Sequence, residues 1–119
     1  MYSVVEDMKQ RDALAEFELC VMLALARLGV QAYGAAIRRE IEAATGRSVS
    51  IGAVYATLGR LGDKGLLRHR VSDPLPIKGG RARKYYWLTQ PGERSLRHSA
   101  TMLRRMMDGV TPALGGVDS

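Results

Sequence analysis

Residues 50–64, with the sequence SIGAVYATLGRLGDK, carry two contrasting helical faces. Val54, Leu58 and Leu61 follow one another at spacings of four and three, which predicts a buried stripe. The opposite face lacks the lysine and glutamate usual on a solvent-exposed helix. It is formed by Gly52, Ala53, Tyr55, Ala56, Thr57, Gly59 and Arg60. Since glycine costs about 1 kcal/mol inside a helix, this face indicates that something large approaches the backbone closely. Close packing against another helix of the chain is the alternative.

The same stretch has a clear start, and two further helices precede it. Ser50 is a favoured N-cap for a helix that runs to about Lys64. An apolar stripe from Leu14 to Leu28 predicts a buried helix over residues 12–29. A second stripe predicts a helix over residues 34–45. Residues 1–11 lack such a stripe, and we expect them to form an N-terminal arm.

A β-hairpin is predicted after the third helix. Residues 66–71 and 84–88 mix apolar and basic side chains as short strands do, and the segment between them is rich in turn-forming residues. We expect Tyr86 or its two neighbours to pack the hairpin onto the core rather than to stack on nucleic-acid bases. The tip of the hairpin carries Lys78, Gly79, Gly80, Arg81 and Arg83.

A last helix, capped by Thr89, begins a C-terminal segment over residues 89–114. Its apolar positions step by four and three, as in the seam of a coiled coil. These positions are Leu96, Ala100, Leu103, Met107, Val110 and Leu114. We expect the helix to end near Val110, the seam to join two copies of the chain, and residues 115–119 to form a loose tail. An amphipathic helix lying on its own domain is the alternative. Met102 and Met106 are candidates to line an apolar effector pocket, although methionines on a helix face are more often plain core.

Charge and composition narrow the function. The chain has 119 residues, enough for one domain, with 18 Lys and Arg against 12 Asp and Glu and a net charge of +6. Residues 60–84 alone carry eight basic and two acidic residues. A positive field of this kind is typical of polyanion binders. The alternative is a solvated basic face that binds no partner. A single cysteine suits a reducing cytoplasm, and no apolar run is long enough to span a bilayer.

The sequence offers no catalytic or cofactor constellation. His69 and His98 have no further ligand at metal spacing, and Gly79 and Gly80 do not form a nucleotide-binding loop. We therefore expect no enzyme activity, no metal and no cofactor.

The predicted order of three helices, strand, basic turn, strand and helix is that of a winged helix-turn-helix over residues 12–88. The fold class is mainly α (α+β), with a long C-terminal dimerisation helix. In such a fold the third helix enters a DNA groove. Ser50 and the first amide groups of that helix can donate hydrogen bonds to phosphate. Arg60 can reach a base edge or a phosphate, and the cations of the hairpin tip neutralise phosphates.

Four motifs make the chain resemble the PadR family of bacterial transcriptional regulators: AYGAAI (32–37), TGRSVSIGAVYATLGRL (45–61), KGLL (64–67) and GGRARKYYWLT (79–89). The resemblance covers roughly residues 19–103 and matches the small branch with one C-terminal helix. It implies a homodimeric winged-helix DNA-binding protein, usually a repressor. The dimer forms through the C-terminal helix with help from the N-terminal one.

The resemblance also implies positions that contact DNA. It places Tyr33 near the DNA backbone and Lys64 on it. It makes Ser50, Gly52, Tyr55, Thr57 and Arg60 groove-facing, and in the wing it points to Lys78, Gly79, Gly80, Arg81 and Arg83. The chain departs from the family at Gly62, where an acidic residue is common. It also lacks a tryptophan on the last helix, where the multidrug-binding branch has one, because Trp87 precedes that helix.

These inferences predict a cytoplasmic, nucleoid-associated bacterial protein. We expect it to bind double-stranded DNA sequence-specifically, as a homodimeric repressor on an inverted repeat, released by a small apolar effector. Two alternatives are a winged-helix ligand sensor and a protein-interaction adaptor, each with only secondary DNA binding.

Overall fold

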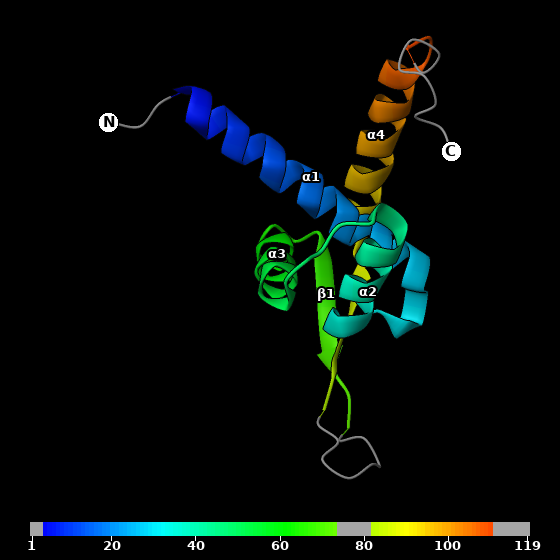
Figure 1. The fold of residues 1–119 in the computed structure, drawn as a ribbon. Coiled ribbons are helices and arrows are strands. Elements are labelled where there is room, and N and C mark those ends of the chain that lie inside the picture. Colours follow the sequence, from blue (N-terminus) through cyan, green and yellow to red (C-terminus); the bar gives the residue numbers. More distant parts are fainter. Residues whose placement is uncertain (1–3, 74–81, 111–119) are drawn as a thin grey trace.

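The computed structural model describes residues 4–73 and 82–110, with side chains described from Glu16 onward. The architecture is mainly helical with one two-stranded antiparallel sheet (Figure 1). The elements are α1 (Val4–Leu28), the 3-10 turn η1 (Gly29–Gln31), α2 (Gly34–Thr45), α3 (Ile51–Asp63), β1 (Leu67–Val71), β2 (Lys84–Leu88) and α4 (Gln90–Met107). This is the predicted order of a winged helix-turn-helix.

One apolar core joins the three helices of the body to the sheet. The predicted stripe of α3 is fully buried, as Val54, Leu58 and Leu61 are at most 1% exposed. It packs with Val21 and Leu25 of α1 and with Ile37 and Ile41 of α2. Burying these side chains stabilises the fold by roughly 1.5–3 kcal/mol each before the loss of chain entropy. The opposite face of α3 is thereby turned away from the core.

Helix α1 is longer than predicted. It begins at Val4, so the prediction of an N-terminal arm is wrong for residues 4–11. Those residues contain helix formers and no proline or glycine, so a helix nucleated by the packed part can extend through them without an apolar stripe. The helix ends as predicted, because Gly29 adopts φ +59°, a left-handed conformation that terminates helices.

Helices α2 and α3 have the predicted ends. Helix α2 spans Gly34–Thr45, and Gly46 follows with φ 73°. Ser50 is the N-cap of α3, and its Oγ accepts a hydrogen bond from the Ala53 N–H at 3.1 Å. The local signals in this part of the chain therefore agree with the fold.

The hairpin formed by β1 and β2, called the wing below, is anchored to the body at its base. Leu67 pairs with Leu88 and Val71 pairs with Lys84. The Tyr86 N–H donates to the Ala32 carbonyl at 2.8 Å, and the Tyr86 ring is buried as predicted. The predicted tip residues Lys78, Gly79, Gly80 and Arg81 lie outside the described residues.

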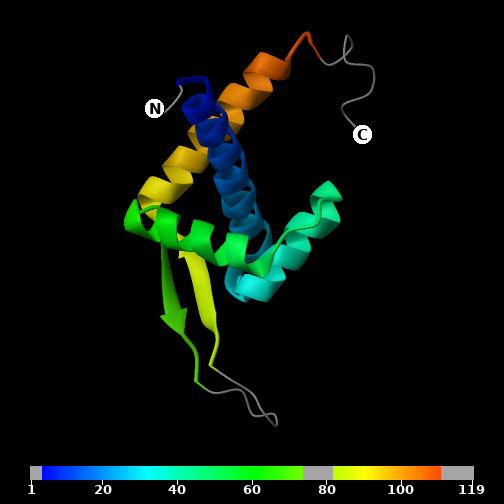
Figure 2. The ribbon, with the colours of Figure 1, turned by 60° about the vertical axis from the view of Figure 1, so that its left-hand side comes forward.

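Helix α4 starts beside the wing and runs away from it. Thr89 is its N-cap as predicted, with its Oγ1 accepting from the Gly92 N–H at 3.1 Å. Gly92 sits so close to the Leu66 carbonyl that a side chain there would overlap it. The helix ends at Met107, three residues before the predicted end near Val110, and Leu114 and residues 115–119 lie outside the described residues. The outer halves of α1 and α4 extend on the side opposite the wing (Figures 1 and 2).

Candidate nucleic-acid interface

The outward face of α3 opens onto solvent. A methyl group built on Gly52 or Gly59 would meet no atom within 4 Å, and Ala53 and Ala56 are exposed. Packing against another helix therefore does not explain these two glycines within the described residues. Small side chains on an exposed helix leave the backbone accessible to a large partner.

Tyr55 interrupts this small face and links α3 to the start of α2. The residue is 48% exposed, and its ring lies so close to Gly34 that a methyl group on Gly34 would overlap it. Gly34 is itself buried. A glycine at position 34 is therefore required to let the Tyr55 side chain lie over the N-terminus of α2.

Thr57 does not face outward. It is 1% exposed, so the prediction that it is groove-facing is wrong. Position 57 lies three residues after Val54 and four before Leu61, which places it within the buried stripe. Its Oγ1 accepts a hydrogen bond from Arg60 Nη2 at 2.9 Å, so Thr57 orients Arg60.

The two predicted cations at the end of α3 contact a carboxylate of α1. Lys64 Nζ lies 3.1 Å and 3.0 Å from the Oε1 and Oε2 atoms of Glu18. Arg60 Nε lies 3.8 Å from Glu18 Oε1, too far for a hydrogen bond. Both cationic side chains remain partly exposed, at 39% for Arg60 and 53% for Lys64. They keep access to solvent while sharing one anion.

A second group of side chains, called the tyrosine–arginine cluster below, joins the N-terminus of α2 to the tip-side end of the wing strands. It consists of Tyr33, Arg39, Arg70, Arg83 and Tyr85. The Arg83 guanidinium carbon lies 4.1 Å from the centroid of the Tyr33 ring, and the Arg70 carbon lies 5.2 Å from the Tyr85 centroid. The two tyrosine rings meet edge to face at 5.8 Å. These distances are within the range of cation–π and aromatic attraction.

Arg39 completes the cluster from α2. Its Nη2 donates a hydrogen bond to the Tyr33 hydroxyl at 2.9 Å. This bond, aided by the positive charge of Arg39 and Arg83, lowers the pKa of the Tyr33 phenol below its ordinary value despite some desolvation. The cluster thus holds three guanidinium groups, one bonded to the Tyr33 hydroxyl and two lying over tyrosine rings.

The sequence indicated part of this cluster. Tyr33 and Arg83 were predicted contacts, whereas Arg39, Arg70 and Tyr85 were not. The hairpin register places Arg70 directly opposite Tyr85, and cross-strand neighbours of this kind can be inferred once the register is known. The contact between Tyr33 and Tyr85, which also form an isolated β-bridge, requires the tertiary structure.

The described cations of the wing differ from those of α3 in their partners. Among the side chains that the structure describes, Arg68, Arg70, Arg83 and Lys84 form no ion pair with a carboxylate. A groove of about 620 Å³ separates the wing from α3 and is lined from both sides, by Tyr55 and Gly59 on α3 and by His69 and Lys84 on the wing. The groove thus brings Tyr55 and Gly59 of α3 next to the wing, with Asp63 as an acidic residue in its lining.

The predicted dimer positions divide into two groups. Leu96 is 9% exposed and belongs to the core of its own chain, so its assignment to a seam between copies is wrong. Leu103, Met107 and Val110 are exposed farther along the C-terminal segment, and so is Ala100. The first turns of α4 pack on the body, and its outer part offers an apolar face.

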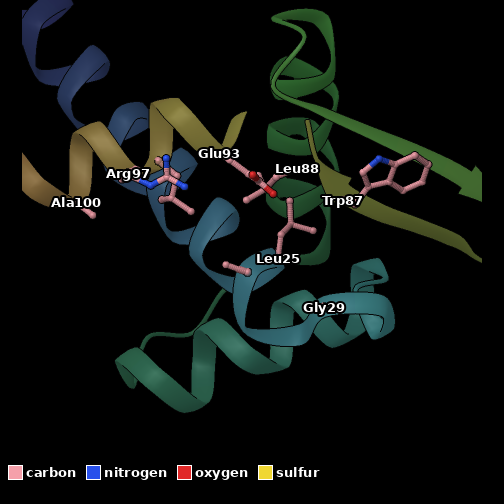
Figure 3. A pocket seen from close by; sticks show the side chains of 9 residues that line it. Leu25, Gly29, Trp87, Leu88, Glu93, Arg97 and Ala100 are labelled. Carbon is pink, nitrogen blue, oxygen red and sulfur yellow. The ribbon is translucent and has the colours of Figure 1, made fainter. Parts of the chain in front are cut away.

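An open pocket lies where α4 meets the body (Figure 3). It has a volume of about 560 Å³ and is lined by Leu25 of α1, Trp87 and Leu88 of β2, and Glu93 and Arg97 of α4, among others. Met102 and Met106, the predicted effector residues, do not line it. They lie exposed on the outer part of α4.

Within residues 4–73 and 82–110, no group of three His, Cys, Asp or Glu side chains could hold a metal ion. In the same part of the chain, no helix is long and apolar enough to cross a membrane.

Comparison with known proteins gives a consistent result. Residues 22–98 match the Transcriptional regulator PadR-like family. The fold is similar to a PadR-like transcription factor from Bacteroides fragilis, with a TM-score of 0.71, 27% identity, and coverage of 90% of this chain and 98% of that one. It is also similar to a PadR family transcriptional regulator from Eggerthella lenta, with a TM-score of 0.63, 28% identity, and coverage of 95% and 98%. No curated protein matches the chain.

Proposed function

The chain belongs to the PadR-like family of transcriptional regulators, so it is a DNA-binding regulator rather than an enzyme, and we propose that it is a homodimeric repressor of an inverted-repeat operator. One observation carries the proposal. The open, small-residue face of α3 lies beside wing cations that no described carboxylate neutralises. Such a surface combines close approach with attraction to phosphate.

Helix α3 is the element that reads the sequence. Gly52 and Gly59 let its backbone lie deep in the major groove, and Tyr55 and Arg60 reach toward base edges. Ser50 and the first amide groups of the helix donate to a phosphate at its N-terminus. Lys64 contacts the backbone at the other end. Thr57 has no DNA contact in this proposal, because it is buried.

The wing and the tyrosine–arginine cluster hold the DNA backbone. Arg39 donates to the Tyr33 hydroxyl, and Arg83 and Arg70 lie over the rings of Tyr33 and Tyr85. This arrangement favours contacts to neighbouring phosphates. Lys78, Gly79, Gly80 and Arg81 remain predicted backbone contacts at the wing tip. Because phosphate contacts carry no sequence information, the wing contributes affinity more than specificity.

The exposed face of α4 supports the dimer. Met102, Leu103 and Met106 of α4 are exposed, as is Val110 beyond the end of the helix. An apolar strip of this kind on a projecting helix is typical of a protein–protein contact. A symmetric pair would place two α3 helices in successive major grooves about 34 Å apart. Leu103→Glu is expected to give monomers in analytical ultracentrifugation. An unchanged dimer mass would reject this assignment.

The first experiment is fluorescence anisotropy with the DNA upstream of the protein's own coding region. A scrambled duplex of equal length serves as the comparison, and both are titrated at two salt concentrations. Tighter binding to the upstream DNA that survives moderate salt is the expected result. Equal binding to both duplexes that disappears with salt would contradict sequence-specific regulation at that site. As a DNA-binding repressor, the protein would act in the bacterial cytoplasm, at the nucleoid.

Ligand sensing is the second candidate function, and the pocket at the base of α4 favours it. The pocket is lined by residues of both β2 and α4, so a small apolar ligand bound there would contact the wing and the proposed dimerisation helix at once. Trp87 is the single tryptophan of the chain and lines the pocket, so its fluorescence reports occupancy. A ligand that changes Trp87 emission and also releases DNA would support an effector. Trp87 quenching with unchanged DNA binding would contradict one. An adaptor function is less favoured, because the exposed wing is cationic.

A further inference from the structure

Glu18 of α1 faces the C-terminal end of α3. Its side chain, on α1, is 16% exposed and contacts Arg60 and Lys64, the only cations between residues 48 and 67. All the positive charge of α3 and its C-cap is therefore held at one carboxylate.

The geometry at Lys64 is that of a phosphate contact. The ammonium group lies 3.0–3.1 Å from both carboxylate oxygens of Glu18, the distance at which lysine binds an anionic oxygen. Glu18 thus occupies a position on Lys64 that a phosphate oxygen would need. Breaking this contact is a cost that DNA has to offset.

Arg60 is held by a different combination. Its Nη2 donates to Thr57, while its Nε is buried, lies 3.8 Å from Glu18, and has no hydrogen-bond partner. Glu18 therefore compensates the charge of Arg60 without occupying the outer guanidinium nitrogens. Those nitrogens keep the ability to read a base edge.

The ion pairs of Glu18 contribute little to the folding stability of the chain. An ion pair between partly exposed side chains contributes about 0–1 kcal/mol. Its larger consequence is electrostatic, because each cation removed from phosphate binding lowers the salt slope of DNA association by about 0.9.

We propose that Glu18 competes with DNA phosphates for Lys64, and so restrains binding to DNA of any sequence. The proposal rests on the proposed DNA-binding function of α3. On random DNA, few base contacts offset the loss of the Glu18 contacts, and the wing cations supply the attraction. On an operator, base contacts of α3 offset that loss. Glu18 is a specificity-determining residue that acts through Lys64.

The test compares Glu18→Gln with Glu40→Gln by anisotropy on a random-sequence duplex over a range of salt. Both changes remove one negative charge, but Glu40 pairs with Arg27 on α1 and contacts no cation of α3. We expect Glu18→Gln to bind about 3–10-fold tighter at low salt, with a slope steeper by about one. Glu40→Gln should leave the slope unchanged. Adding Lys64→Gln to Glu18→Gln should remove most of the gain.

Unchanged or weaker binding by a folded Glu18→Gln protein, with an unchanged slope, would overturn the inference. Thermal unfolding shows whether the variant is folded. If Glu18→Gln does not fold, the single variant Lys64→Gln tests the inference. The inference requires it to change the slope by less than half as much as Arg83→Ala, and an equal change overturns it. Absence of salt-dependent binding by the unaltered protein would instead overturn the proposed function.

Discussion

The helical body and the wing hold their cations in opposite ways. In the body, Arg27, Arg38, Arg47, Arg60 and Lys64 each lie within 4 Å of a carboxylate on α1 or α2. In the wing, Arg70 and Arg83 lie over tyrosine rings instead. A ring holds a guanidinium in place without cancelling its charge. Counting charges therefore overestimates how many cations of the body are free to bind DNA phosphates. For Arg70 and Arg83 of the wing, the count is a better guide.

Arg39 is the exception that extends this contrast. It belongs to α2, yet it bonds to the Tyr33 hydroxyl rather than to a carboxylate. It thereby joins the wing side of the surface. The boundary between cations paired with a carboxylate and cations held by a tyrosine therefore does not coincide with the boundary between body and wing.

The largest effect is expected from Arg60→Ala. Arg60 is the cation of the body that we propose reads a base, so its loss should remove about 1–3 kcal/mol of preference for the upstream DNA over random DNA. Anisotropy on the two duplexes measures the difference. An equal loss on both would make Arg60 a phosphate contact like those of the wing.

A smaller effect should separate the two regions directly. Arg83→Ala removes an uncompensated wing cation and should flatten the salt slope by about one, with similar weakening on specific and random DNA. Arg27→Ala removes a cation already paired with Glu40 and should leave the slope unchanged. Equal slopes for the two variants would break the comparison.

Gly59→Ala should affect stability and binding in opposite directions. The new methyl group meets open space, and alanine is favoured over glycine in a helix by about 0.5–1 kcal/mol. Thermal unfolding should therefore shift upward. DNA binding should weaken because the methyl group holds α3 away from the groove. Unchanged affinity would show that this face does not lie against DNA.

The smallest effect concerns the Tyr33 phenol. Its lowered pKa means that it ionises at lower pH than an ordinary tyrosine, and Arg39→Ala should move that ionisation back upward. Absorbance titration, with Tyr33→Phe to identify the signal, measures the shift. The pKa of Tyr33 is lower in the folded state than in the unfolded state, so ionisation stabilises the fold. This stabilisation is absent below the folded-state pKa and is complete only above the ordinary tyrosine pKa. An identical titration of Arg39→Ala and the unaltered protein would contradict the role of Arg39.

The sequence predicted the helix ends where local chemistry sets them. Ser50, Thr89, Gly29 and Gly46 act within one turn of the backbone, so their effect is visible in the sequence. The start of α1 was missed because its first residues bury no apolar stripe, and periodicity is the signal that a sequence offers. Thr57 was misplaced because a threonine can be buried when an arginine donates to its hydroxyl.

By itself, the sequence determined the order of elements, the stripe of α3 and the concentration of charge after residue 60, because all three depend on neighbours along the chain. Only the tertiary structure decided which charges are available. Lys64 and its partner Glu18 are 46 positions apart, and Tyr33 meets Arg83 and Tyr85 across the junction of α2 and the wing. Whether a cation meets a carboxylate or an aromatic ring depends on packing between distant segments. That packing therefore decides whether the cation is free to bind a DNA phosphate.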